Sequence, residues 1–137
     1  MDRIKWLPLL AFATLAAPAY AQETGAAAAC DALLSPYAQS ACLEKLADAA
    51  DTKMNEVYRH AFLTISKSDH NNIGEWKTAL KSAQQTWIAF RDADCGPLAG
   101  YEWNHGTGMG AATKRCLLEK TTQRTQELVQ RYIVEDH

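Results

Sequence analysis

The residues best suited to contact another molecule lie in a glycine-rich segment between two cysteines. Gly96 to Gly110 holds five of the chain's seven glycines, with large polar and aromatic side chains dispersed among them. Glycine lets a backbone approach a partner closely, and tyrosine and tryptophan dominate interface hot spots. We therefore predict that this loop binds a partner; the alternative is that its aromatic rings fold back and cap the helices. The predicted contact residues are Tyr101, Trp103, Asn104, His105 and Thr107.

Polar side chains also recur at helical spacing beside the apolar faces. Gln84, Trp87 and Arg91 fall at i, i+3 and i+7, which places an amide and a guanidinium on either side of an indole. Such residues could line a binding cleft between helices. A guanidinium that faces a helix interface needs a partner, however, and another predicted helix supplies a carboxylate. We therefore predict a structural network, formed by Asp51, Asn55, Tyr58, Gln84, Arg91, Thr121 and Arg124.

The sequence carries no pattern typical of an enzyme or a metal site. Its four histidines do not have the spacing of metal ligands. Asp92 and Asp94 lie two residues apart at a helix end, so they point in different directions rather than forming an acid and base pair. A nucleophile elbow, a phosphate loop and a dinucleotide fingerprint are all missing. We predict a protein that is not an enzyme, with no catalytic residues, no metal and no cofactor.

Residues 1–21 have the features of a secretory signal peptide. Arg3 and Lys5 precede an apolar run from Trp6 to Ala17, and a small-x-small cleavage site ends at Ala21. The run is shorter than the roughly 18 residues that span a bilayer, so we predict cleavage and a single soluble domain over residues 22–137. A lipoprotein anchored at Cys30 is the alternative, but it would leave an odd number of cysteines for pairing.

The charge of the exported domain excludes one class of partner. Removing Arg3, Lys5 and Asp2 with the signal changes the formal net charge from −2 to −3. A nucleic-acid-binding protein needs a basic patch, which this balance does not suggest. Mild acidity is compatible with a basic protein as the partner.

All four cysteines lie in the predicted exported part of the chain. An even number of cysteines in an oxidising compartment favours disulfides over a metal site. Three connectivities are possible. We choose Cys30–Cys42 and Cys95–Cys116, because each pair encloses a segment rich in serine, proline or glycine that cannot pack by itself. Because the predicted signal peptide is cleaved, we expect the domain to act in the periplasm or outside the cell.

Apolar residues spaced three and four apart predict three long helices and no sheet. The helices are expected over Ala38 to Ile65, Ile73 to Asp94 and Ala111 to Tyr132. Gly96 and Pro97 are expected to end the second helix, and no regular element is expected from there to Gly110. We predict an antiparallel bundle with room for a short helix near Asp31 to Leu34. The preceding Gln22 to Ala29 is expected to be a frayed tail.

The same spacing predicts which side chains face the core. In the first helix they are Cys42, Leu46, Ala50, Met54, Val57, Ala61 and Ile65; in the second they are Trp76, Leu80, Ala83, Trp87 and Phe90. In the third helix, one stripe runs along Leu117, Thr121, Arg124, Leu128 and Tyr132.

One combination of motifs resembles a known family. The second helix carries Gln-x-x-Trp-x-x-x-Arg-x-x-x-Cys over residues 84–95, and Cys116 and Thr-x-x-Arg at 121–124 follow. With Cys30 and Cys42 upstream, this pattern resembles the LprI-type lysozyme-inhibitor family, small exported bacterial helical proteins, over nearly the whole mature chain. The resemblance implies a helical fold and inhibition of lysozyme. The founding type is lipid-anchored, whereas this signal has the features of a cleaved one.

The resemblance suggests a role for the glycine-rich loop. Lysozyme-type enzymes work with two carboxyl groups in a groove. We predict that the loop plugs the groove of a lysozyme-like peptidoglycan hydrolase and that His105, Asn104, Thr107 or Tyr101 hydrogen-bonds those carboxyls. The alternative function is an envelope accessory or immunity protein that docks on a protein partner without inhibiting host lysozyme.

Overall fold

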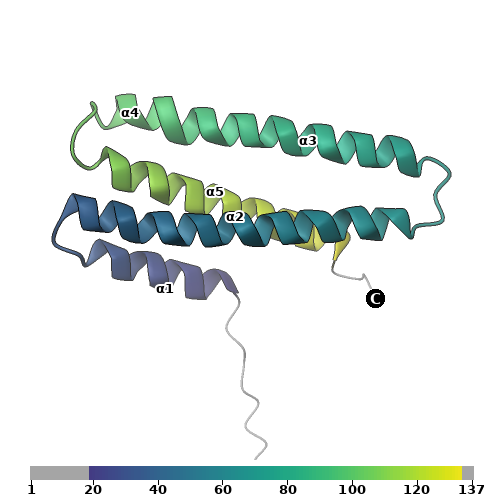
Figure 1. The fold of residues 1–137 in the computed structure, drawn as a ribbon, viewed down its shortest axis with the longest axis horizontal. Helices are drawn as coiled ribbons and strands as arrows, with labels where there is room; N and C mark the ends of the chain where they lie inside the picture. Colours follow the sequence, from purple (N-terminus) through teal and green to yellow (C-terminus); the bar gives the residue numbers. More distant parts are fainter. Residues whose placement is uncertain (1–18, 134–137) are drawn as a thin grey trace, which may run out of the picture.

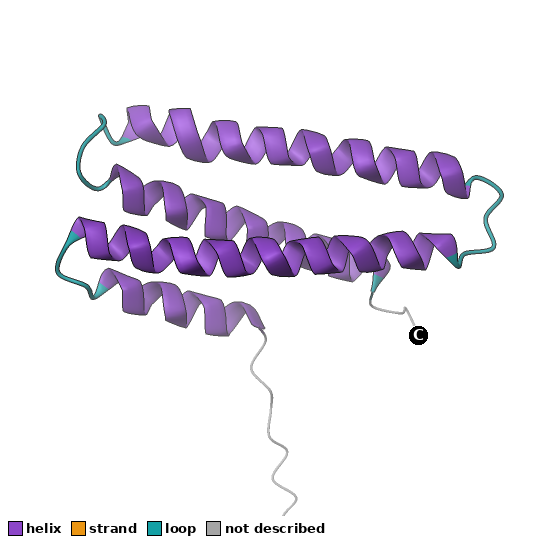
Figure 2. Cartoon of the chain, in the orientation of Figure 1, coloured by secondary structure: helices purple, strands orange, loops and turns teal. Residues whose placement is uncertain are grey.

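The computed structural model describes residues 19–133, and every regular element in that range is helical (Figures 1 and 2). In Figure 1, α2 and α5 run in the same direction and α3 runs opposite to both, while α1 lies antiparallel to α2. The most extensive interface joins α2 and α5. The predicted all-helical bundle is confirmed. Its elements are α1 (Ala19–Asp31), α2 (Pro36–Ser66), α3 (Ile73–Ala93), the π-helical turn η1 (Asp94–Leu98), α4 (Ala99–Glu102) and α5 (Met109–Tyr132).

Most of the predicted signal peptide lies outside the described residues. Only its last three residues, 19–21, are included, where they begin α1. Cleavage after Ala21 would therefore leave α1 starting at Gln22. Between residues 19 and 133, no helix has both the length and the apolar character needed to cross a membrane.

The amino-terminal helix is longer and begins earlier than predicted. Gln22 to Ala29, expected to be frayed, is helical, and the chain turns just after Asp31, where a short helix was expected. Alanine has the highest intrinsic helix propensity, and this segment is rich in it. Ala27 and Cys30 are buried in the core formed with α2 and α5, so tertiary packing adds to the intrinsic helix propensity in stabilising α1.

α2 starts where the sequence changes from a turn to a helix. Its N-cap, Ser35, accepts a hydrogen bond at Oγ from the Ala38 backbone N–H at 3.0 Å, and Pro36 occupies the first turn. A capping oxygen satisfies one free N–H, and proline has no N–H to satisfy, so both residues favour this start. The helix therefore begins two residues before the predicted Ala38.

The core consists of two apolar clusters in line along α2 and α5. The predicted positions Ala50, Met54, Val57, Ala61 and Ile65 are buried, whereas Leu43 and Ala47 take the places expected for Cys42 and Leu46. The first cluster joins α1, α2 and α5, and the second joins α2, α3 and α5. The third helix that packs on the α2–α5 pair therefore changes along its length.

α3 turns a different face to the core than its apolar spacing predicts. Ala83 and Phe90 are exposed, whereas Gln84 is only 5% exposed and Arg91 points inward. Leu80 remains buried, and Trp87 packs against the second cluster as predicted. The rotation brings polar groups inward because α2 and α5 supply hydrogen-bond partners for them.

The chain does not leave the helical conformation at Gly96 and Pro97. It continues through η1 and α4, and the Ala99 backbone N–H donates to the Asp94 carbonyl five residues earlier. A proline inside an α-helix collides with the preceding turn, and the wider π-helical turn accommodates its ring. The predicted irregular segment from Gly96 to Gly110 is thus wrong, and the turn is confined to residues 103–108.

A buried hydroxyl on α5 offers a test of the packing. Among the described residues, Thr122 Oγ1 is buried without a hydrogen-bond partner. An unsatisfied buried hydroxyl costs about 1 kcal/mol or more, so Thr122→Val should raise the free energy of unfolding by about 1 kcal/mol. Urea denaturation measures the change. The control is Thr125→Val, which removes a 2.8 Å bond to the Thr121 carbonyl and should give no gain; equal gains from both variants would contradict the assignment.

Candidate functional site: the loop end of the bundle

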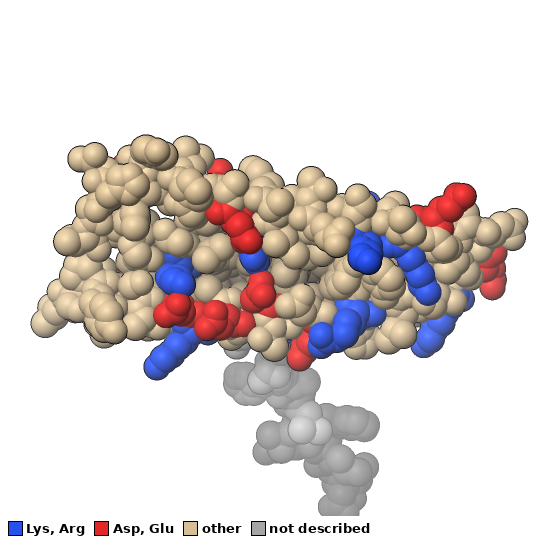
Figure 3. All heavy atoms as spheres, turned by 45° about the horizontal axis from the view of Figure 1, so that its top comes forward, with Lys and Arg blue, Asp and Glu red and all other residues tan. Residues whose placement is uncertain are grey.

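Two turns meet at one end of the bundle, on the left in Figure 1. The first turn, residues 32–35, joins α1 to α2, and the second, residues 103–108, joins α4 to α5. We call this the loop end. In the view of Figure 3 its surface carries almost only uncharged side chains, while the charged ones gather farther along the bundle. A surface of this kind is suited to contact with another protein.

The second turn is held in a defined shape by its own backbone. Asn104 and His105 have φ angles of 48° and 52°, in the left-handed region. The His105 N–H donates to the Gly100 carbonyl, and the Gly106 N–H donates to the Trp103 carbonyl, both at 2.9 Å. Asparagine and histidine are among the non-glycine residues enriched in that region. The two residues thus reverse the chain within a short, hydrogen-bonded turn.

All five predicted contact residues are exposed, four of them in this turn and Tyr101 on α4 directly before it. Tyr101 is 75% exposed and Trp103 is 51% exposed, and Asn104, His105 and Thr107 are exposed as well. The alternative, in which the two aromatic rings bury themselves against the bundle, is not the arrangement found. The exposed rings remain available to a partner.

The two rings of the turn are supported from below. A Cβ at Gly108 would lie 2.4 Å from Trp103 Cζ3, so the absence of a side chain there lets the indole rest on the start of α5. The His105 ring meets the Tyr101 ring edge to face at 5.4 Å and lies over Gly100. Small residues under large rings therefore fix how the turn presents them.

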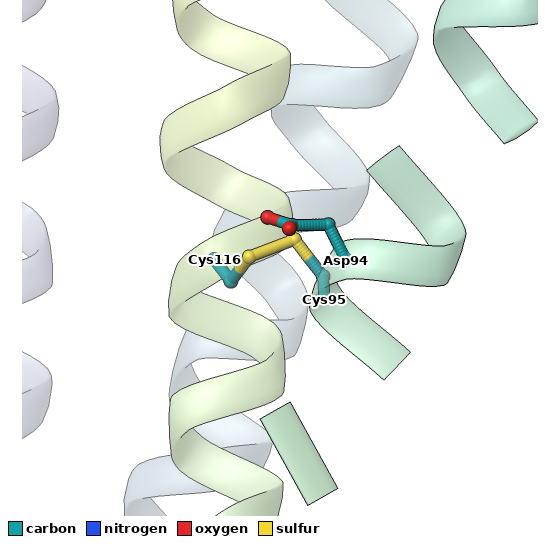
Figure 4. A group of neighbouring side chains, drawn as sticks. All are labelled: Asp94, Cys95 and Cys116. Atoms are coloured by element: carbon teal, nitrogen blue, oxygen red, sulfur yellow. A yellow bond between two sulfur atoms is a disulfide. The ribbon is translucent and has the colours of Figure 1, made fainter. Parts of the chain in front are cut away.

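The predicted Cys95–Cys116 disulfide ties η1 to α5 directly behind the turn. Figure 4 shows the Asp94 carboxylate beside the two sulfurs, and the three groups lie within 4.8 Å of one another. A metal would need thiolates, and these sulfurs are bonded to each other, so the cluster is no metal site while the disulfide is intact. Asp94 instead pairs with Lys120 Nζ at 2.9 Å.

Arg91 joins three helices in the middle of the bundle. Its Nη1 donates to Asp51 Oδ1 on α2 at 2.7 Å and to Thr121 Oγ1 on α5 at 3.1 Å, and its guanidinium also pairs with Asp92 at 2.9 Å. Burial by itself lowers the pKa of Arg91, but the hydrogen bonds and charges of Asp51 and Asp92 outweigh burial and raise the pKa. Arg91 is therefore a fixed positive charge that α2 and α5 both hold.

A second arginine completes the polar layer one turn away. Arg124 donates from Nε to the buried Gln84 Oε1 at 3.0 Å and from Nη1 to Glu127 Oε2 at 2.9 Å. Gln84 in turn approaches the Met54 sulfur at 3.4 Å. Trp87 lies between the two arginines, whose Cζ atoms are 5.2 Å (Arg91) and 5.9 Å from its ring. The layer is packed and satisfied, which is how a structural network differs from an open cleft.

Two residues predicted for the network lie apart from it. Asn55 is exposed, and the hydrogen bonds of the described residues do not include it. The Tyr58 ring packs on Phe62 at 5.1 Å within the second apolar cluster, and burial raises the pKa of its hydroxyl. Asn55 and Tyr58, at i+4 and i+7 from Asp51, share its helix face only approximately. The positions on this part of α2 that face the core are Met54 and Val57.

The first turn of the loop end has no predicted functional role, yet its side chains are exposed. Leu34 in this turn is fully exposed, and Tyr37, in the first turn of α2 that follows, is 85% exposed. The signal in the sequence was a pair of leucines directly before the Ser35 cap, in a turn that has no apolar face to fill. A hollow of about 490 Å³ near Leu63 and Ile133, toward the opposite end, has mixed charges on its rim and also had no sequence signal.

The chain is similar to known proteins over most of its length. The model of the family described as lysozyme inhibitor LprI matches residues 27–128. An uncharacterized protein of Rhizobium meliloti (strain 1021), R02472, is 33% identical over 119 residues, which cover 82% of this chain and 83% of that protein. No solved structure gives a significant match. The range matched by the family includes both disulfides and the whole loop end.

Proposed function

Because the chain belongs to the LprI lysozyme inhibitor family, we propose that it is an exported protein that inhibits a lysozyme-like peptidoglycan hydrolase by occluding the active-site groove. The family is one of inhibitors, which agrees with a binding role and a lysozyme as the partner. Two disulfides are typical of proteins outside the cytoplasm and support the periplasm or the exterior as the place of action.

The turn at residues 103–108 is the element we assign to the groove. The observation that carries this proposal is the exposure of Trp103 on this turn and of Tyr101 on α4 directly before it, with both segments anchored by Cys95–Cys116. Aromatic side chains on a rigid support lose little entropy on docking, so their contact area converts efficiently into affinity. Exposed large aromatic residues cost the free protein solubility, which supports a role in binding.

Chemistry at the turn complements the enzyme class. A glycosidase of this kind has one carboxyl group that donates a proton and a second that stays charged. The His105 ring, the Asn104 amide and the Thr107 hydroxyl all offer hydrogen-bond donors, and all three are exposed. In our proposal these donors bind the carboxyl pair while the aromatic rings fill the sugar subsites. Inhibition is then competitive and needs no cofactor.

Removing the two central side chains of the turn tests this proposal. Trp103→Ala with His105→Ala should weaken inhibition about 30-fold or more, the loss expected when a hot spot is truncated. Gly108→Ala should also weaken inhibition, because its methyl group would displace the Trp103 ring. The measurement is the inhibition constant of the purified chain against a panel of muramidases, with circular dichroism to confirm folding.

A matched control distinguishes the turn from other exposed apolar positions. Leu63 is 55% exposed near the far end of α2, so Leu63→Ala should inhibit like the wild type. Unchanged inhibition in the double variant would exclude the turn. If the oxidised wild type inhibits no muramidase in the panel, the accessory or immunity role becomes the better account.

A further inference from the structure

Exposed apolar side chains are concentrated at the loop end. Nine large hydrophobic residues are exposed among the described residues, and three of them lie elsewhere on the molecule. Only some of these exposed side chains lie on the second turn and on η1 and α4, the short helical segments before it. The rest belongs to the first turn, next to α1. The six at the loop end are Leu33, Leu34, Tyr37, Leu98, Tyr101 and Trp103.

One groove of about 530 Å³ lies between the two turns: the start of α2, just after the first turn, forms one wall, and the second turn forms the other. Pro36 and Gln39 line it on the side of the first turn, and Trp103 and Thr107 line it on the side of the second. The start of α5 forms the floor, including Ala111. Trp103 thus belongs both to the surface proposed for the hydrolase and to this groove, so the two are continuous.

Each wall is braced separately. Cys30–Cys42 closes the chain around the first turn, as Cys95–Cys116 does around the second. The Gln39 side chain donates to the Leu33 carbonyl at 2.8 Å and to the Asp31 carbonyl at 3.2 Å, which holds the first turn against α2. Arg115 on α5 forms an ion pair with the Asp31 carboxylate. A surface fixed at this many points is already organised for binding.

We propose that the first turn is the second half of the hydrolase-binding surface. This inference rests on the function proposed above. In this arrangement the second turn enters the active-site groove of the enzyme. One edge of the enzyme's active-site groove then lies in the groove between the two turns of this chain, and Leu34 and Tyr37 contact the outer side of that edge. The groove between the two turns is lined by two carboxylates, Asp31 and Glu119, and one guanidinium, Arg115, and the predicted exported domain carries a formal net charge of −3, so the proposed partner is a basic protein.

The test uses the mature full-length chain and a hydrolase that the wild type inhibits. Leu34→Ala with Tyr37→Ala should weaken binding at least tenfold, measured by calorimetry and by the inhibition constant. Both side chains are almost entirely exposed, so the variant should unfold at the wild-type temperature. Leu63→Ala, the matched control at the opposite end, should bind within twofold of the wild type.

The possible failures are distinguishable. If the Leu34 and Tyr37 variant binds like the wild type while Trp103→Ala binds weakly, the inference is overturned and the proposed function stands. If the wild type binds no hydrolase, both are overturned. Sedimentation of the wild type as a dimer that the Leu34 and Tyr37 variant disperses would assign the surface to a second copy of the chain and overturn the inference.

Discussion

Replacing Cys95 and Cys116 together by alanine is expected to lower the free energy of unfolding by about 3 kcal/mol. The two cysteines are 21 residues apart. A cross-link over that separation lowers the conformational entropy of the unfolded chain, and this loss corresponds to roughly 3 kcal/mol of stability. A domain of this size has about 5–15 kcal/mol of stability in total, so the loss is a large share. The thermal midpoint should fall by about 10 °C or more, as measured by circular dichroism.

The other disulfide is the matched control. Cys30 and Cys42 are 12 residues apart, and because the entropy depends on the logarithm of that separation, their removal should also cost about 3 kcal/mol. The two variants should differ in where mobility increases, since each frees a different wall of the loop end. Hydrogen exchange at residues 103–108 should rise when Cys95–Cys116 is removed. A midpoint unchanged by that removal would show that packing alone holds η1 on α5.

Features set by local spacing were predictable from the sequence. The boundaries of α3 and α5 follow from three-to-four spacing and shift by at most two residues in the structure. The disulfide pairing followed from the glycine, serine and proline content of the enclosed segments, and it is confirmed. Both kinds of feature depend on residues close together in the chain.

The face of α3 could not be predicted because it depends on other helices. Hydrophobicity alone places Phe90 in the core and Arg91 beside it, yet Arg91 is inside and Phe90 is 54% exposed. Phe90 keeps a contact on the surface, since Lys120 Nζ lies 4.9 Å from its ring centroid. The decisive factor is that Asp51 and Thr121 offer hydrogen bonds to the guanidinium.

The conformation of the segment after Cys95 was predicted wrongly for a related reason. Gly96 and Pro97 usually end a helix, but here the disulfide holds Cys95 against α5 and a π-helical turn accommodates the proline. The irregular part is therefore shorter than predicted. Four of the five predicted contact residues nevertheless lie in the turn at 103–108, and Tyr101 lies on α4 directly before it. Asn104 and His105 have the left-handed backbone that reverses the chain there.

Arg124→Met is expected to cost about 2–3 kcal/mol of stability. Methionine keeps most of the aliphatic volume, so the loss comes from polar contacts rather than from a cavity. The Gln84 amide is 5% exposed and would lose the donor to its Oε1, and an unpaired buried acceptor costs about 1–3 kcal/mol. Glu127 is more accessible, at 42% for its side chain, and water replaces much of its lost contact. Urea denaturation monitored by tryptophan fluorescence measures the change.

Two further variants separate the buried contact from the surface one. Glu127→Gln removes the exposed ion pair and should cost less than about 1 kcal/mol. Arg124→Met combined with Gln84→Leu removes both partners of the buried bond, and this pair should recover much of the stability lost by Arg124→Met alone. If the double variant is instead less stable by the sum of the two single changes, the bond does not couple α3 to α5. If the polar layer is structural, each folded variant should bind its hydrolase like the wild type, because the loop end is unchanged. Weakened binding by a fully folded Arg124→Met chain would instead show that the polar layer belongs to the binding surface.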